Sequence, residues 1–148
     1  MDVHNIFIQA HRGFAYLEIL LVVVFLVSLL IVMFGYSGNI SKLLRKSTLF
    51  TMIFFHIQFI VGAIMLFATS AFTDIISSQG MGAIMKNSDL RFTYIEHPFS
   101  MLIAAVLMTV INKKVKSNEK LSMGVFILAI VALALFGYAL PWARLFNS

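Results

Sequence analysis

The sequence predicts an all-α integral membrane protein: a four-transmembrane-helix bundle with a short interfacial segment in the second loop. Composition is the first observation behind this prediction. Of the 148 residues, 61% are hydrophobic and 11% are charged, whereas a soluble domain is about half apolar and about a quarter charged. The second observation is four apolar runs, each close to the ~20 residues that cross a bilayer. The third is the basic charge of two connecting loops. Residues 1–148 are therefore expected to form one transmembrane domain.

The four apolar runs predict four spans joined by short connections. They cover about residues 14–34, 48–71, 92–111 and 121–140. The apolar part of the first run is too long for a cleavable signal peptide, and no small-residue cleavage site follows it. Because backbone polar groups inside a bilayer must be satisfied within the protein, each run is expected to be a helix. The helices then pack on one another and contact membrane lipid.

The charges of the loops predict the orientation in the membrane. The first loop carries Lys42, Arg45 and Lys46, the third carries four lysines against one glutamate, and the second is nearly balanced. Basic loops lie on the cytoplasmic side, so both termini and the second loop are expected on the outer, periplasmic side of a bacterial inner membrane. The net charge of +5 has the same explanation. No basic face interleaved with aromatic residues indicates nucleic-acid binding.

The second loop is expected to contain structure of its own. Within this loop, residues 73–87 include enough isoleucine and methionine for a short helix lying in the membrane interface. Gly80 and Gly82 interrupt this stretch, which is compatible with two pieces. After the fourth span, Pro141 ends the helix and Trp142 is a residue type typical of interfacial anchors.

His11 and His97 are the leading candidates for function. They stand near the starts of the first and third spans, which both run from outside to inside, so both imidazoles belong to the outer face. Counting ~1.5 Å per residue, their depths agree to within about 10 Å. Singly, His11 suits an interfacial histidine and His97 a helix-start residue before Pro98. As a pair on two helices of a bundle, they are candidates for holding one metal ion or haem iron between them, because haem iron accepts two axial imidazoles.

Two arginines lie at the same outer edge of the predicted bundle. Arg12 follows His11 directly, and Arg91 precedes the third span. Each is a candidate for pairing with a haem propionate through charge-assisted hydrogen bonds. The alternative for both is ordinary interfacial charge, with the side chain reaching the lipid headgroups.

Glu18 and His56 are candidates for a second site or a proton-linked role. Glu18 follows His11 by two helical turns, so it is expected to face the bundle interior or a wet cavity. Either a structural hydrogen bond or proton coupling fits it. His56 lies on the order of 15 Å or more from the outer boundary. It is interpreted as a neutral histidine bonded to a neighbouring helix, a second haem ligand, or a proton relay.

These segments resemble one four-helix half of the haem A synthase family. In that family a His-Arg motif opens one span, a helix with a Gln…Gly pattern follows, and a further histidine opens the next span. The matching segments here are residues 9–16 with His11-Arg12, residues 56–62 with Gln58 and Gly62, and residues 96–101 with His97. The chain is also similar to short four-span bacterial proteins called cytochrome b.

The resemblance covers about the first three spans and implies a bis-histidine b-type haem between His11 and His97. Three departures separate the chain from the synthases. It has one half of their architecture, it has no cysteine and so lacks the pair that some of them carry, and Ile8 stands where the catalytic half has a glutamate. Synthase activity is therefore not expected. The absence of cysteine also excludes disulfides, iron–sulfur clusters and covalent c-type haem.

The leading hypothesis is thus an inner-membrane b-type cytochrome that transfers electrons or handles haem near the outer face. The alternative is a haem-free accessory subunit of a larger membrane complex, because the chain has few spans, short loops and no recognisable active-site motif. Both hypotheses imply membrane-protein partners or a redox complex rather than a stand-alone enzyme. A third, a proton-coupled transporter using Glu18 and His56, requires oligomerisation.

Overall fold

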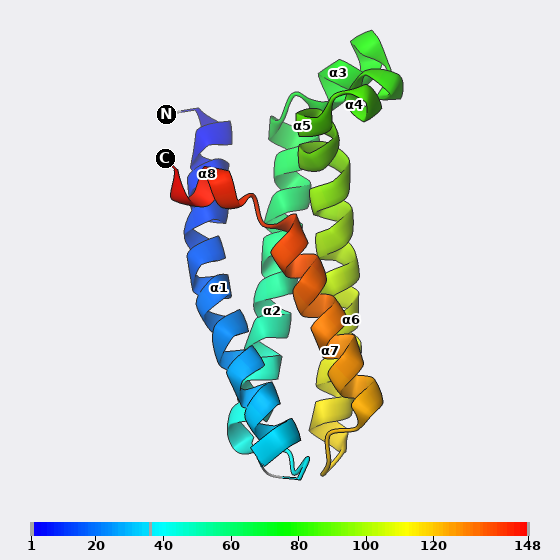
Figure 1. The fold of residues 1–148 in the computed structure, drawn as a ribbon. Helices are drawn as coiled ribbons and strands as arrows, with labels where there is room; N and C mark the ends of the chain where they lie inside the picture. The colour runs from blue at the N-terminus through cyan, green and yellow to red at the C-terminus, as the bar shows by residue number, and fades with distance from the viewer. Residues whose placement is uncertain (1, 36, 148) are drawn as a thin grey trace.

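The computed structural model describes residues 2–35 and 37–147, and this part of the chain is almost entirely helical (Figure 1). It contains no β-strand, and its one β pairing is an isolated antiparallel bridge between Asn39 and Lys120. The long helices run side by side: α1 (Val3–Gly35), α2 (Lys42–Ile64), α6 (His97–Ser117) and α7 (Met123–Ala139). The predicted all-α bundle is confirmed.

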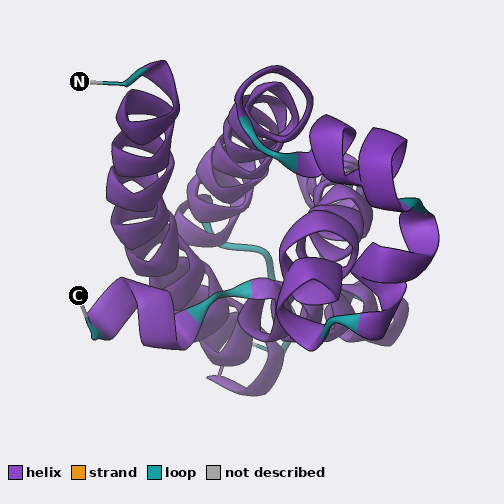
Figure 2. Cartoon of the chain, turned by 90° about the horizontal axis from the view of Figure 1, so that it is seen from above, coloured by secondary structure: helices purple, strands orange, loops and turns teal. Residues whose placement is uncertain are grey.

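Short helical elements extend or connect the long ones. The π-helical turn η1 (Met65–Thr69) continues α2, and a second π-helical turn, η2 (Phe92–Glu96), leads into α6. Between them lie α3 (Phe72–Gln79), α4 (Met81–Lys86) and α5 (Ser88–Arg91), and α8 (Trp142–Phe146) follows α7. Viewed from above, the short helices lie around part of one end of the bundle (Figure 2).

Three helical stretches are long and apolar enough to cross a membrane: Val3–Gly35, Lys42–Thr69 and Ser88–Ser117. All three are longer than the spans predicted from the sequence, because polar residues at their ends continue the helix beyond the apolar core. The fourth predicted span corresponds to α7, which has 17 residues. At ~1.5 Å per residue its length is about 25 Å, shorter than a typical hydrocarbon core, so the count of four spans stays a prediction.

The two ends of the bundle differ in the way the sequence predicts. The loops α1–α2 and α6–α7 meet at what we call the basic end, where Leu121 N–H donates to the Gly38 carbonyl (2.7 Å). Arg45 also donates there to carbonyls at the end of α6, those of Val115, Lys116 and Asn118, which suits a cation at a helix C-terminus. Both termini and α3–α5 lie at the other, terminal end (Figure 1). This relative placement is confirmed, and the orientation in the membrane stays a prediction.

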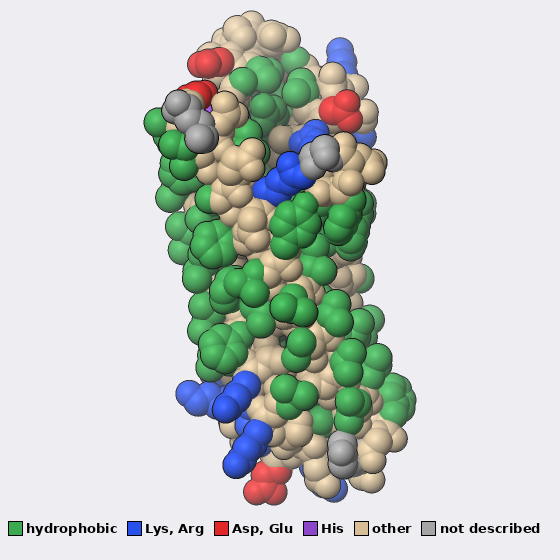
Figure 3. Space-filling model, turned by 90° about the vertical axis from the view of Figure 1, so that its left-hand side faces the viewer, with side chains coloured by type: hydrophobic (Ala, Val, Ile, Leu, Met, Phe, Trp, Pro, Cys, Tyr) green, Lys and Arg blue, Asp and Glu red, His purple; other side chains and the backbone are tan. Residues whose placement is uncertain are grey.

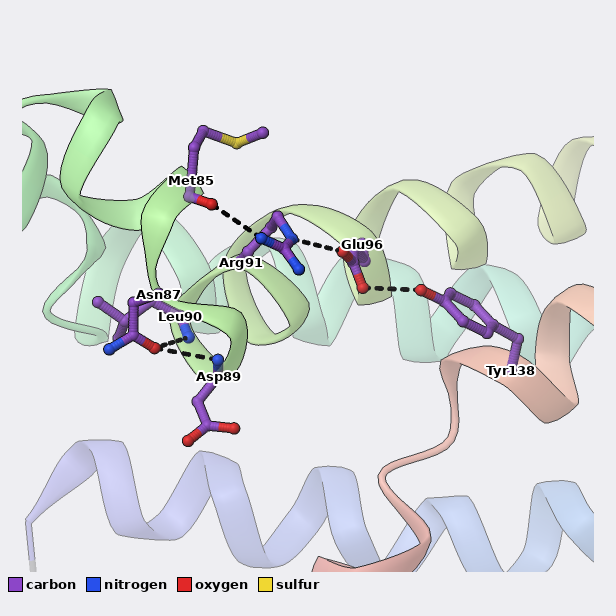
Figure 4. Close-up of polar contacts among 7 residues, drawn as sticks. All are labelled: Met85, Asn87, Asp89, Leu90, Arg91, Glu96 and Tyr138. Atoms are coloured by element: carbon purple, nitrogen blue, oxygen red, sulfur yellow. Dashed lines mark hydrogen bonds and ion pairs between the residues drawn. The ribbon is translucent and has the colours of Figure 1, made fainter.

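Residues 73–87 of the second loop form two helical pieces, α3 and α4, as predicted, and a third short helix, α5, follows them. Gly80 has a φ of 78°, a conformation that favours glycine, and it separates α3 from α4. Gly82 lies inside α4, so the expected interruption at Gly82 is wrong. A further break at Asn87 arises because its side-chain oxygen accepts from the N–H groups of Asp89 and Leu90 and begins α5 (Figure 4).

In the packing of the bundle, α1 has one main helical neighbour, α2. Alanines of α6 and α7, such as Ala104 and Ala132, are fully buried and allow these two helices to lie close together. Phe55 of α2 stacks on Phe136 of α7, with ring centres 5.1 Å apart. In contrast, α1 packs mainly against α2 and touches α7 much less. The outer surfaces of the long helices are covered with apolar side chains (Figure 3), as lipid contact requires.

Replacement of Phe55 by alanine is expected to destabilise the bundle strongly. The side chain is fully buried and stacked, so its loss leaves a cavity and lowers the free energy of unfolding by about 3 kcal/mol. Phe50→Ala is the matched control on the same helix, because Phe50 is 48% exposed. Denaturant titration in bicelles measures both variants, and equal stabilities of the two would contradict this account of the core.

Candidate functional site

A cavity of about 730 Å³ lies in the terminal half of the bundle, between α1, α2, η2, α6 and α8. Its walls are mainly apolar. The polar or charged side chains that line it are His4, His11, Arg12, Glu18, Gln58, Ser70, Thr93, Tyr94, His97 and Arg144. Ligand and cofactor sites have this size and this pattern of few polar groups in an apolar wall. Four of the residues singled out from the sequence, His11, Arg12, Glu18 and His97, therefore share one cavity.

The ring of His97 is fixed by a backbone carbonyl at the end of another helix. Its Nδ1 lies 2.6 Å from the carbonyl oxygen of Ala139. Because a carbonyl oxygen can only accept, Nδ1 carries the proton, and the lone pair of the neutral ring is on Nε2. This arrangement, one nitrogen bonded to the protein and the other free to coordinate, is typical of metal-binding histidines.

His11 lies directly beside His97. Their ring centres are 6.1 Å apart and the ring planes are at 82°. Two imidazoles that bind one metal ion from opposite sides have their centres about 6.3 Å apart, for metal–nitrogen bonds of about 2.0 Å and ring bonds of about 1.35 Å. The expected similarity of depth is thus confirmed. His11 lies inside α1, because α1 begins well before the predicted span, whereas His97 is the first residue of α6 and directly follows the π-helical turn η2.

The surroundings of His11 leave space and hydrogen-bonding capacity at the ring. Its Nδ1 is buried and has no hydrogen-bond partner among the described residues. Gly62 of α2 faces the ring, and a Cβ atom added there would lie 3.5 Å from His11 Cε1. A side chain larger than alanine at this position would therefore extend into the space beside the imidazole, which lines the cavity.

The two histidines form a ligand pair rather than a complete site for a bare metal ion. Within residues 2–35 and 37–147, no group of three or more His, Cys, Asp or Glu side chains is placed to hold an ion. Protein-bound zinc takes at least three protein ligands. Two imidazoles suit a metal that brings its own equatorial ligands, as haem iron does.

Glu18 and Gln58 form a buried polar group deeper in the same cavity. Glu18 is 2% exposed and faces the interior, as predicted. Gln58 donates through Nε2 to the His11 carbonyl (2.9 Å), and its side chain also interacts with those of His11 and Glu18. Glu18 Oε1 and Gln58 Oε1 are buried without a partner in the described part of the chain. Such oxygens are normally satisfied by ordered water or a ligand.

The arginines differ from the expectation based on sequence. Arg12 lines the cavity and donates to the Leu145 carbonyl (3.3 Å). Arg91 is not among the lining residues; it forms an ion pair with Glu96 (2.8 Å) and donates to the Met85 carbonyl (Figure 4). Tyr138 donates to the other oxygen of Glu96 (2.7 Å), so this network joins α5, η2 and α7. A propionate-binding role for Arg91 would require it to leave this network.

Two residues that the sequence analysis gave no role also line the cavity. Arg144 of α8 donates to Thr93 Oγ1 (3.1 Å). His4 lies with its Nδ1 2.9 Å from Thr69 Oγ1. The signal for His4 was present in the spacing, because it lies two turns before His11 on the same stripe of α1. No comparable signal exists for Arg144, which follows the last apolar run.

His56 lies outside the cavity. Its Nδ1 donates to the Met52 carbonyl (2.7 Å), and its Nε2 is 3.1 Å from Thr109 Oγ1 on α6. The predicted bond to a neighbouring helix is therefore present. The structure does not bring His56 to the other candidate residues.

Comparison with known proteins identifies no relative: no family model, curated protein or solved structure matches the chain. The resemblance to the haem A synthase family and to four-span cytochromes b stays a prediction, and the function has to be argued from the site itself.

Gln58→Leu is expected to lower the stability of the protein, because it removes the donor to the His11 carbonyl and a polar neighbour of the buried Glu18 carboxyl. A buried polar group left without a partner costs about 1–3 kcal/mol. The double variant Glu18→Leu/Gln58→Leu removes both members and is expected to recover part of this loss. Thermal unfolding in detergent compares the variants. If the double variant loses as much as the two single variants together, the two side chains do not act as a unit.

Proposed function

We propose that this protein is an inner-membrane b-type cytochrome that binds one haem b through His11 and His97. The observation that carries the proposal is the pair of imidazole centres 6.1 Å apart at the wall of an apolar cavity of about 730 Å³. The separation agrees with the spacing of two axial ligands, and the cavity has a volume in the range of small-molecule and cofactor sites.

Several residues of the chain would hold the cofactor, each by a different contact. His11 and His97 would be the axial ligands, with the Ala139 carbonyl orienting the His97 ring. The apolar walls would exclude water, and Arg12 would pair with a propionate. Bound haem supplies reversible one-electron chemistry. Because both imidazoles would hold the iron, electron transfer or haem handling is favoured over catalysis at the metal.

The proposed setting is a bacterial inner membrane, with α7 as a fourth span and the cavity near the periplasmic face. Three lysines lie in the last turn of α6 or in the α6–α7 connection, beside the α1–α2 loop with its own basic residues. Basic loops remain on the cytoplasmic side. The electron partner would then be a membrane protein or a redox complex that reaches the outer face.

Purified membranes containing the protein are expected to show haem b bands in the dithionite-reduced-minus-oxidised spectrum. His11→Ala and His97→Ala each remove one axial ligand, so both are expected to lose or shift the Soret and α bands. His56→Ala is the matched control, because His56 is bonded to Met52 and Thr109 away from the cavity.

The proposal is overturned if the wild type, expressed with sufficient haem, shows no haem b bands. It is also overturned if the Soret and α bands are unchanged in both His11→Ala and His97→Ala. A wild type without bands that co-purifies with a larger complex favours the haem-free accessory subunit.

The orientation is tested by single cysteines, which the chain allows because it has none of its own. Ser78 on α3 and Ser117 at the end of α6 are both exposed and lie at opposite ends of the bundle. In spheroplasts, which lack the outer membrane but keep an intact inner membrane, a membrane-impermeant maleimide is expected to label Ser78→Cys. Ser117→Cys is expected to react only after the inner membrane is permeabilised. The reverse pattern contradicts the proposed topology.

A further inference from the structure

A second cation stands at the edge of the cavity, on the short helix α8. Arg144 lines the cavity, and its charge is close enough to His97 to interact with that imidazole. Among the described residues its hydrogen bond goes to the neutral Thr93 hydroxyl, and it takes part in no ion pair. A guanidinium beside an apolar cavity without an acidic partner provides a binding position for an anion.

The position of Arg144 is set by contacts that join α8 to α1. The Leu145 carbonyl accepts hydrogen bonds from Tyr16 (2.5 Å) and Arg12 (3.3 Å). On its other side, α8 is connected to η2 by the bond from Arg144 to Thr93. Figures 1 and 2 show α8 running from the end of α7 across to α1. Arg12 and the residue next to Arg144 are therefore in direct contact at one edge of the cavity.

The charges around the cavity are unevenly distributed. Among the described residues that line the cavity, the one with a carboxyl group is Glu18, which lies about 9 Å further along the α1 axis than Arg12. The nearby Glu96 is engaged by Arg91 and Tyr138 outside the cavity. The edge formed by α8 and α1 thus carries two guanidinium groups, while the rest of the wall is mostly apolar. This distribution complements a flat apolar molecule with carboxylates along one side.

We propose that Arg144, together with Arg12, binds the carboxylate edge of the ligand, with α8 as the element that brings the two arginines together. The proposal rests on the proposed function, in which that ligand is haem b. It assigns to Arg144 the propionate contact for which the sequence had suggested Arg91. Arg144 is a binding residue for the anionic edge and not an iron ligand.

The test compares haem b with its dimethyl ester, which has the same ring and iron but no free carboxylate. The purified full-length protein in nanodiscs of zwitterionic lipid is titrated with each compound, and binding is followed by the Soret absorbance. Arg144→Gln is expected to weaken haem binding about tenfold, the loss of one charge-assisted contact, and to leave ester binding unchanged. Arg144→Lys, which keeps the charge, is expected to fall between the wild type and Arg144→Gln.

A control variant separates a direct contact from a disturbed fold. Arg91→Gln removes an arginine that lies at the same end of the bundle but outside the cavity, and it is expected to bind the two compounds as the wild type does. Equal weakening of haem and ester by Arg144→Gln, or no weakening of either, overturns the role of Arg144 alone. A wild type that binds neither compound overturns the proposed function as well.

Discussion

The hydrogen bond between His97 and the Ala139 carbonyl is the interaction on which the arrangement of the site depends. The carbonyl is free because Pro141 prevents α7 from continuing, and the last carbonyls of a helix have no partner within it. The same interruption turns the chain toward α1 and begins α8. A single proline therefore supplies the acceptor that orients one imidazole and directs the segment that carries Arg144 to the edge of the cavity.

The site differs from the rest of the bundle in how many of its buried polar groups have a hydrogen-bond partner. Elsewhere buried hydroxyls are paired, as between Ser28 and Ser47 (3.0 Å) or from Thr51 to the Leu21 carbonyl (3.4 Å). In an apolar surrounding an unpaired polar atom is costly. The buried side-chain atoms without partners in the described residues belong to His11, Glu18 and Gln58, and all three line the same cavity. This concentration of unsatisfied groups is a stronger indication of a binding site than the histidines alone.

The sequence predicts the features that depend on hydrophobicity and loop charge, which are the long helices and the end of the bundle that each loop shares. It does not predict the features that depend on short local contacts, such as the partners of the arginines. The apolar runs predict the long helices, and the basic loops correctly predict which connections share an end. The inward face of Glu18 follows from its spacing to His11. The sequence does not show which arginine, Arg91 or Arg144, is available to bind a propionate. Position along the chain does not reveal that Arg91 forms an ion pair with Glu96. Helix α8 spans five residues, too few for a periodic pattern.

Helices α1 and α7 make few direct contacts, and the chain segments next to them are joined by different contacts at the two ends of the bundle. At the basic end the connection is made by backbone bonds between loops, such as Ile40 N–H to the Glu119 carbonyl (2.9 Å). At the terminal end it depends on side chains of α1 that meet the Leu145 carbonyl. Because α8 follows all the long helices in the chain, synthesis from the N-terminus completes this edge last. The edge of the cavity that α8 forms is therefore completed only after the long helices α1, α2, α6 and α7, which make up the rest of the bundle.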